Sequence, residues 1–152
     1  MTRRQLVALA ALGSLGLLAG AWAFQHLFGY APCKMCIWQR YPHASAAGLG
    51  ALFLMLPWAP ILMLGAASAL ITAGIGGFHV GVEQGWWEGP ASCSAGAIGN
   101  LSASDLMDQI MAAPLVRCDE IAWSLAGISM AGWNAILSLA LAGLWLAAWR
   151  RA

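Results

Sequence analysis

Long apolar stretches without charges constrain the fold of this chain more than any other feature. A helix needs about 20 apolar residues to cross a bilayer core about 30 Å thick. Four stretches rich in Ala, Gly and Leu approach or exceed this length, at residues 6–24, 41–56, 61–82 and 122–149. Charged residues make up only 9% of the chain, whereas they make up about a quarter of a soluble domain. The sequence therefore predicts a single all-α membrane domain, a bundle of four transmembrane helices.

The first stretch has an alternative interpretation as a signal peptide. It follows Arg3-Arg4 and contains Ala21-Trp22-Ala23, a pattern of the kind found at cleavage sites. Its apolar run exceeds the roughly 7–15 residues of a signal-peptide core. We therefore expect this stretch to be a transmembrane helix.

The order of the stretches predicts a topology. Four spans place both termini on one side of the membrane and both longer loops, residues 25–40 and 83–121, on the other. Pro57-Trp58-Ala59-Pro60 makes a tight turn between the second and third spans. The positive-inside tendency places the termini in the cytoplasm, because four arginines lie there: Arg3, Arg4, Arg150 and Arg151. The net charge is only +1, and the absence of a basic run argues against a nucleic-acid partner.

The four cysteines of the chain all lie in the two predicted outer loops. Cys33 and Cys36 form a C-x-x-C motif in the first loop, and Cys93 and Cys118 lie in the second. An even number of cysteines on one face is typical of an oxidising compartment. The cysteines therefore favour two extracytoplasmic, cysteine-bearing loops.

Three interpretations of these cysteines compete. Two structural disulfides are one, and a bridge from Cys93 to Cys118 would suit it by closing a long loop. A zinc site is another, but the second pair is spaced too widely for a zinc knuckle. Redox chemistry is the third, because a C-x-x-C disulfide exchanges readily and closes too short a loop to add much stability. The spacing of Cys33 and Cys36 favours redox chemistry.

Nearby cations support the redox interpretation. Lys34 lies inside the motif and Arg40 lies four residues after Cys36, and cations favour the thiolate over the thiol. Arg40 also enters the predicted membrane boundary. It is either an anchor that extends to the interface or a group that hydrogen-bonds a ligand oxygen and stabilises its negative charge.

Residues 32–42, PCKMCIWQRYP, resemble the P-C-x-x-C-x-x-Q-R-x-P stretch of the disulfide bond formation protein B (DsbB) family. The resemblance covers nearly the whole chain. It includes four spans, His79 near the end of the third span, and two cysteines about 25 residues apart in the second loop. Residues 123–133, WSLAGISMAGW, resemble the start of that family's last helix.

The resemblance implies a multi-pass enzyme of the bacterial inner membrane, with cytoplasmic termini and periplasmic cysteine loops. Such an enzyme is a protein-disulfide:quinone oxidoreductase that supports disulfide bond formation. It reoxidises a periplasmic DsbA-like thioredoxin-fold oxidase and passes the electrons to a membrane quinone, either ubiquinone or menaquinone.

The resemblance also implies a role for each candidate residue. Cys93–Cys118 would be the disulfide that the reduced partner attacks at Cys93, and Cys118 would then exchange with Cys33. Cys36 would donate to the quinone, and Arg40 would lie against a quinone carbonyl. His79 would be a second quinone ligand or a proton donor, or else an interfacial histidine bonded to backbone or water.

Other functions remain as alternatives. A four-span structural or adaptor protein would carry two inert disulfides. A vitamin K epoxide reductase-like protein would share four helices and quinone chemistry, but in that family the loop pair precedes the membrane-end C-x-x-C, the reverse of the order here. A transporter is disfavoured because no span carries a central charged residue.

Overall fold

The structure is a computed structural model that describes residues 1–90, 93, 102, 104, 107, 108, 111 and 116–151. Its long helices are α1 (Arg3–His26), α2 (Lys34–Met55), α3 (Ala59–Glu83) and α5 (Met130–Trp149). A short antiparallel hairpin of β1 (Ser124–Leu125) and β2 (Ile128–Ser129) precedes α5. Most of residues 91–115, in the predicted second loop, lies outside the described part.

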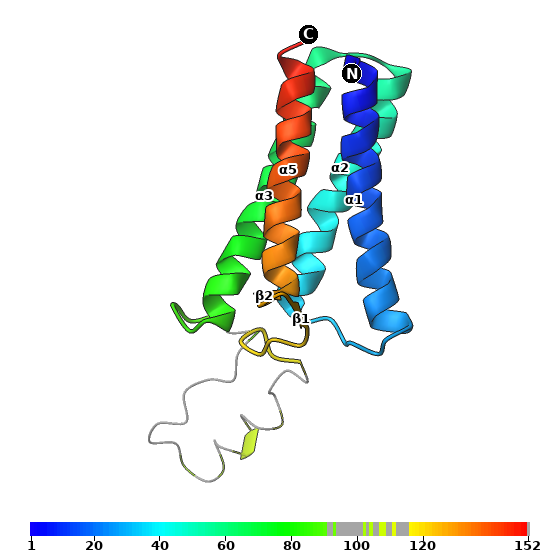
Figure 1. Cartoon of the computed structure of the whole chain (residues 1–152). Helices are drawn as coiled ribbons and strands as arrows, with labels where there is room; N and C mark the ends of the chain where they lie inside the picture. Colours follow the sequence, from blue (N-terminus) through cyan, green and yellow to red (C-terminus); the bar gives the residue numbers. More distant parts are fainter. Residues whose placement is uncertain are drawn as a thin grey trace.

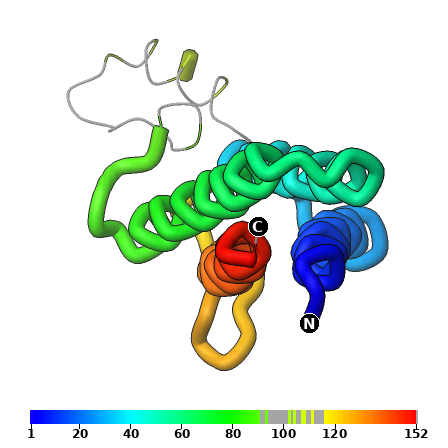
Figure 2. Tube along the Cα trace, turned by 90° about the horizontal axis from the view of Figure 1, so that it is seen from above, coloured from blue at the N-terminus to red at the C-terminus, as the bar shows by residue number. Residues whose placement is uncertain are grey.

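The four helices run side by side, with both termini at one end and the hairpin at the other (Figure 1). Viewed along the bundle, α1 packs on α2 and α5, and α3 packs on the same two helices (Figure 2). The cysteine-bearing segments before α2 and before α5 therefore meet at the end of the bundle opposite the termini, as the predicted topology requires.

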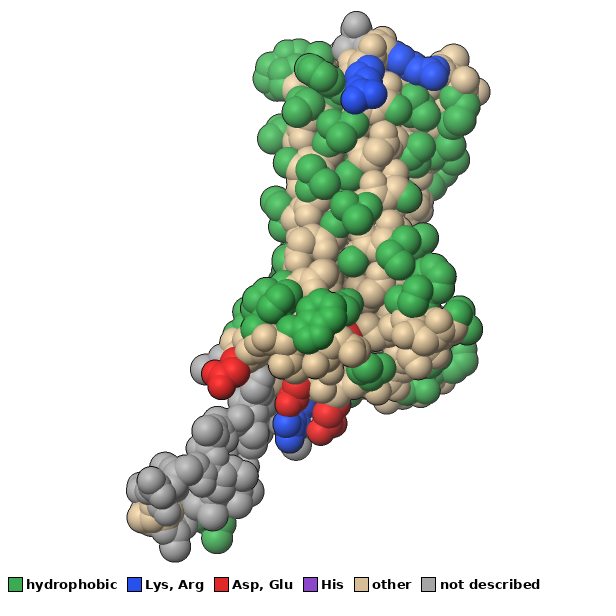
Figure 3. All heavy atoms as spheres, turned by 60° about the vertical axis from the view of Figure 1, so that its left-hand side comes forward, with side chains coloured by type: hydrophobic (Ala, Val, Ile, Leu, Met, Phe, Trp, Pro, Cys, Tyr) green, Lys and Arg blue, Asp and Glu red, His purple; other side chains and the backbone are tan. Residues whose placement is uncertain are grey.

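The outer surface of the bundle is apolar along its length. Hydrophobic side chains lie along the face seen in Figure 3, with basic side chains at one end and acidic side chains, together with a further basic one, towards the other. Among the described helices, α1, α3 and α5 are long and apolar enough to cross a membrane. The first half of α2 carries Lys34, Gln39, Arg40 and His43, so a fourth crossing by α2 stays a prediction.

Helix α2 begins at Lys34, seven residues before the span predicted from residue 41. Cys33 caps it, because the Cys33 Sγ accepts a hydrogen bond from the Cys36 backbone N–H at 3.2 Å. A sulfur thus takes the place of the usual capping oxygen. The C-x-x-C motif consequently lies on the first turn of the helix, and Arg40 lies one turn further along the same face.

The stretch predicted at residues 122–149 is a hairpin followed by a helix. Gly127, at φ 77°, and Ala126, at φ 53°, form the left-handed turn between β1 and β2. Ser129 then caps α5 through a hydrogen bond from the Gly132 backbone N–H to its hydroxyl. The hairpin shortens the helix to 20 residues and holds Ala122 and Trp123 beside the ends of α1 and α2.

Small residues let the helices pack closely. Trp145 of α5 is fully buried, and its indole fills the space beside Gly65 of α3. Gly50 of α2 lies directly against Ala11 of α1. Close backbone approach of this kind strengthens van der Waals packing, which helps helices associate in lipid, where the hydrophobic effect between helices is absent.

Candidate functional site

The first cysteine pair lies at the start of α2. The Cys33 thiol donates a hydrogen bond to the Cys36 sulfur, with the two sulfurs 2.7 Å apart. This bond raises the pKa of Cys33 well above its ordinary value, and burial and the neighbouring Cys36 charge raise it further. The same bond lowers the pKa of Cys36, which lies before the stretch predicted to span the membrane. The hydrogen bond therefore favours the thiolate at Cys36 and the proton on Cys33.

The second pair, Cys93 and Cys118, forms a disulfide with its Cα atoms 5.3 Å apart. The Cys118 backbone N–H donates to the Cys93 carbonyl at 2.9 Å, and the Cys93 N–H donates to the Pro90 carbonyl at 2.8 Å. Both cysteines are fully buried and pack in one cluster with Cys33, Met35 and Val82. The two pairs thus share a single buried site.

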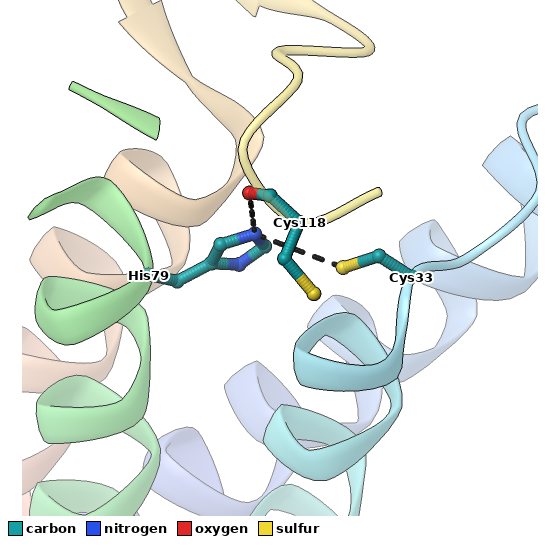
Figure 4. Close-up of side chains that lie close together, drawn as sticks. All are labelled: Cys33, His79 and Cys118. Atoms are coloured by element: carbon teal, nitrogen blue, oxygen red, sulfur yellow. Dashed lines mark hydrogen bonds between the residues drawn. The ribbon is translucent and has the colours of Figure 1, made fainter. Parts of the chain in front are cut away.

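Cys33, His79 and Cys118 converge from three segments (Figure 4). Their sulfur atoms and a His79 ring nitrogen all lie within 4.8 Å of one another. The His79 Nε2 is 3.1 Å from the Cys118 carbonyl oxygen and 3.7 Å from the Cys33 Sγ. Zinc binds thiolates, and the disulfide leaves Cys118 without one. This arrangement therefore favours exchange between the pairs over a metal site.

The contacts of His79 fix its tautomer. Gln39 Nε2 lies 3.2 Å from the Met35 carbonyl oxygen and 3.1 Å from the His79 Nδ1. Because the Met35 carbonyl only accepts, the Gln39 atom facing it must be the amide nitrogen, which also donates to Nδ1. The proton of His79 is therefore on Nε2, which faces the Cys118 carbonyl and the Cys33 sulfur. In this form His79 donates to the sulfur and cannot take its proton.

A cavity of about 410 Å³ lies on the other side of Cys36, between α1, α2, α5 and the segment before β1. Its walls are mostly apolar, but Cys36 and Arg40 both line it. The Arg40 guanidinium is tied to α1 by the Gln25 side-chain oxygen at 2.7 Å and the Ala21 carbonyl at 3.4 Å. Its buried Nε has no hydrogen-bond partner among the described residues.

His43 and Asn134 form a second polar region on the cavity wall, which sequence reasoning missed. His43 Nε2 is 2.8 Å from the Asn134 Oδ1, although the residues lie 91 positions apart. His43 is only 3% exposed, and its Nδ1 has no partner among the described residues. Polar side chains in two apolar helices are a signal that could have found this pair, because buried polar groups in membranes tend to pair.

Glu83 is another residue that the sequence did not single out. Its side chain is 5% exposed, accepts a hydrogen bond from the Ser129 hydroxyl, and lies 4.0 Å from the His79 Nε2. It joins the end of α3 to the start of α5, next to the cysteines. Glu83, Cys33 and His79 line a small hollow of about 40 Å³.

The predicted site residues thus divide between two neighbouring places. Cys33, Cys93, Cys118 and His79 make the exchange cluster, whereas Arg40 lines the large cavity. Cys36 lines both the cavity and the small hollow beside Cys33. His79 is not among the residues that line the large cavity, so its contacts favour a part in exchange over direct quinone binding.

Comparison with known proteins identifies the family. The family model of disulfide bond formation protein DsbB matches residues 3–148. The chain belongs to the DsbB family. It is 37% identical over 163 aligned residues to disulfide bond formation protein B of Verminephrobacter eiseniae, covering 97% of this chain and 85% of that protein. It is 34% identical over 140 residues to the protein of the same name from Polaromonas naphthalenivorans, covering 86% and 81%.

No solved structure matches this chain with significant similarity. DsbB family membership makes the chain a membrane oxidoreductase of disulfide bond formation. This membership supports an oxidoreductase over an adaptor protein, and the redox role of the individual cysteines stays a prediction.

Proposed function

We propose that this chain oxidises a reduced periplasmic thioredoxin-fold protein and passes two electrons to a membrane quinone. In this proposal residues 41–56 form the fourth span, the termini are cytoplasmic, and the cysteine end faces the periplasm of the inner membrane. The net reaction converts the partner dithiol and a quinone into the partner disulfide and a quinol.

The first steps are thiol–disulfide exchanges. A partner thiolate attacks Cys93, the Cys93–Cys118 bond breaks, and Cys118 leaves as a thiolate. The partner's second thiolate then releases Cys93 and completes the partner disulfide. Cys118 attacks Cys33 of the oxidised Cys33–Cys36 pair, and Cys36 leaves as a thiolate. Attack of Cys93 on Cys118 restores their bond and leaves Cys33 and Cys36 reduced, the state in which both pairs are found here.

His79 assists the exchange between the pairs. When Cys93 displaces Cys33 from Cys118, negative charge develops on the Cys33 sulfur. The Nε2–H of His79 lies 3.7 Å from that sulfur and can donate to it, because hydrogen bonds to an ionised acceptor are stronger than neutral ones. The same N–H holds the Cys118 carbonyl at 3.1 Å and keeps the two sulfurs close.

The large cavity suits a quinone head group. A bound quinone accepts two electrons and two protons and becomes a quinol. The apolar walls fit its ring, and the Arg40 Nε, buried without a partner, can donate to one of its oxygens. Cys36 borders the cavity, and its lowered pKa supplies the thiolate through which the pair donates.

One observation carries this proposal: the cysteines form a continuous route from the loop disulfide to the cavity. The Cys118 and Cys33 sulfurs lie within 4.8 Å, the Cys33 and Cys36 sulfurs are 2.7 Å apart, and Cys36 lines the cavity. Thiol–disulfide exchange requires direct contact between the attacking and the attacked sulfur. Because neighbouring sulfurs on this route are already close, each exchange needs only a small movement of the cysteines.

Quinone-dependent turnover tests the proposal. The purified chain in detergent receives a reduced thioredoxin-fold dithiol protein and a short-chain ubiquinone or menaquinone, and the loss of quinone absorbance is followed. Replacing any of the four cysteines by Ser should abolish turnover. The Cys93→Ser variant should still reduce one equivalent of quinone after chemical reduction of Cys33 and Cys36, which separates the two halves of the reaction.

Ser45→Ala is the matched control, because Ser45 bonds Ser68 between α2 and α3 and lies outside the cavity lining. It should turn over at the wild-type rate. Absence of turnover with both quinones, with both cysteine pairs unreactive toward the dithiol, would overturn the proposal.

A further inference from the structure

The polar contacts around His43 form a chain whose hydrogen-bond directions can be assigned. Asn134 Nδ2 lies 3.2 Å from the Thr72 hydroxyl and 3.4 Å from the Thr72 carbonyl. The Thr72 hydroxyl donates to the Gln39 carbonyl at 3.1 Å, so towards Asn134 it accepts. Because both Thr72 atoms accept, the Asn134 nitrogen faces them and its oxygen faces His43.

This orientation determines which nitrogen of His43 carries the proton. Asn134 Oδ1 only accepts and lies 2.8 Å from the His43 Nε2, so Nε2 must donate. In a neutral imidazole the other nitrogen is then an acceptor. That acceptor, Nδ1, is buried and has no partner among the described residues. A buried polar atom without a partner costs about 1–3 kcal/mol, which favours a ligand that supplies a donor.

Arg40 and His43 both line the cavity, and each has a buried polar atom without a partner among the described residues. They lie three residues apart on α2, which puts them on one face with their Cβ atoms about 5–6 Å apart, and both line the cavity. Arg40 can only donate, whereas His43 Nδ1 accepts. The two together match a ring with an accepting oxygen at one position and a hydroxyl at another.

We propose that His43 Nδ1 binds a hydroxyl of the reduced quinone, so that the cavity holds the quinol more tightly than the quinone. This inference rests on the proposed quinone chemistry. In that reaction the Cys33–Cys36 pair passes two electrons and the Cys33 proton to the quinone, and water supplies the second proton, which leaves a disulfide and a quinol. A quinone carbonyl has no proton for Nδ1, but each quinol hydroxyl does. His43 therefore stabilises the product and makes the reduction more favourable.

Binding constants of the two redox forms test this proposal. The full chain with Cys33→Ser and Cys36→Ser binds without electron transfer and serves as the parent. Trp123 and Trp133 line the cavity, so quenching of tryptophan fluorescence by a short-chain ubiquinone, or by its quinol under anaerobic conditions, gives each Kd.

Two substitutions of His43 separate its nitrogens. Gln places its amide near the position of Nε2 and keeps the bond to Asn134, whereas Asn places its amide near Nδ1. His43→Gln should weaken quinol binding about 3- to 10-fold, the effect of one lost hydrogen bond, and leave quinone binding unchanged. His43→Asn should bind quinol more tightly than His43→Gln. His26→Gln is the control, because His26 is exposed at the end of α1 and does not line the cavity.

The outcomes distinguish the two proposals. If the parent binds neither form, the quinone chemistry itself is overturned, and this inference with it. If both forms bind and His43→Gln weakens them equally, His43 has only a structural role. If His43→Gln changes neither, water alone satisfies Nδ1. Each of the last two results overturns the assignment of His43 and leaves the proposed function intact.

Discussion

Gln39 of α2 and His79 of α3 are joined by a hydrogen bond of 3.1 Å that sets the direction in which His79 donates. Both residues are buried. With Nδ1 occupied by Gln39, the remaining N–H of His79 faces the Cys118 carbonyl and the Cys33 sulfur. A residue outside the disulfide chemistry thus positions a donor between the two cysteine pairs.

Gln39→Leu should slow transfer between the pairs. Without the Gln39 amide, nothing holds His79 in the tautomer that donates to sulfur. Loss of one such bond, worth about 1 kcal/mol, slows the transfer about fivefold. Acid quenching followed by mass spectrometry of alkylated cysteines measures the rate at which reduced Cys93 and Cys118 reduce the Cys33–Cys36 disulfide. Gln84→Leu, at an exposed position after α3, is the control. An unchanged transfer rate in Gln39→Leu would show that Gln39 does not position His79 for the exchange.

The pH dependence of Cys36 reactivity follows from the hydrogen bond that lowers its pKa. A lowered pKa keeps the thiolate populated as the pH falls below the ordinary cysteine value of about 8.5. The rate at which iodoacetamide alkylates Cys36 should therefore fall only at pH values below the ordinary cysteine pKa. The pH–rate profile, read by mass spectrometry of the Cys36 peptide, gives the inflection.

Two substitutions of Cys33 provide the matched pair for this measurement. Cys33→Ala removes the donor, so the pKa of Cys36 should rise and the inflection should move to higher pH. Cys33→Ser keeps a hydroxyl donor and should retain part of the shift. An inflection that stays in place in Cys33→Ala would show that another group stabilises the thiolate.

The sequence predicted those parts of this structure that follow local patterns. Apolar stretches identified the helices, and the C-x-x-C motif with Arg40 identified one end of the site. Helix α2 begins before the apolar stretch at residues 41–56, because a cysteine sulfur caps the helix and no propensity rule signals this. The hairpin before α5 was hidden because residues 122–129 are nearly as apolar as the helix that follows them.

Contacts between distant segments were beyond sequence reasoning. His43 and Asn134 are each marked by their polarity in an apolar helix, but they meet only because α2 and α5 border the same cavity. His79 was expected near a quinone, but its position depends on how α3 packs beside the start of α2.

Packing of Gly65 against Trp145 predicts a steric limit in the bundle. A Cβ at Gly65 would lie 2.6 Å from the Trp145 indole, and that ring is fully buried. Gly65→Ala should therefore destabilise the protein by about 1–3 kcal/mol, measured as a lower thermal unfolding midpoint in detergent.

Gly74 provides the control in the same helix. A Cβ there meets nothing within 4 Å, so Gly74→Ala should be neutral or stabilise the helix by up to about 1 kcal/mol. Equal effects at both positions would mean that helix propensity, rather than contact with Trp145, decides the outcome.

Arg40 should contribute to quinone binding through its charge and its planar geometry. Gln25 and the Ala21 carbonyl hold its terminal nitrogens, which leaves the buried Nε free to donate to the ligand. Hydrogen bonds to charged groups are worth about 1.5–3 kcal/mol, so Arg40→Gln should raise the quinone Kd by about 10- to 100-fold.

Arg40→Lys should recover only part of this affinity, because an ammonium group cannot keep the same directed contacts. Arg150→Gln, at the opposite end of the bundle, should leave the Kd unchanged. An equal quinone Kd in Arg40→Gln and wild type would mean that Arg40 only links α1 to α2 and does not bind the quinone.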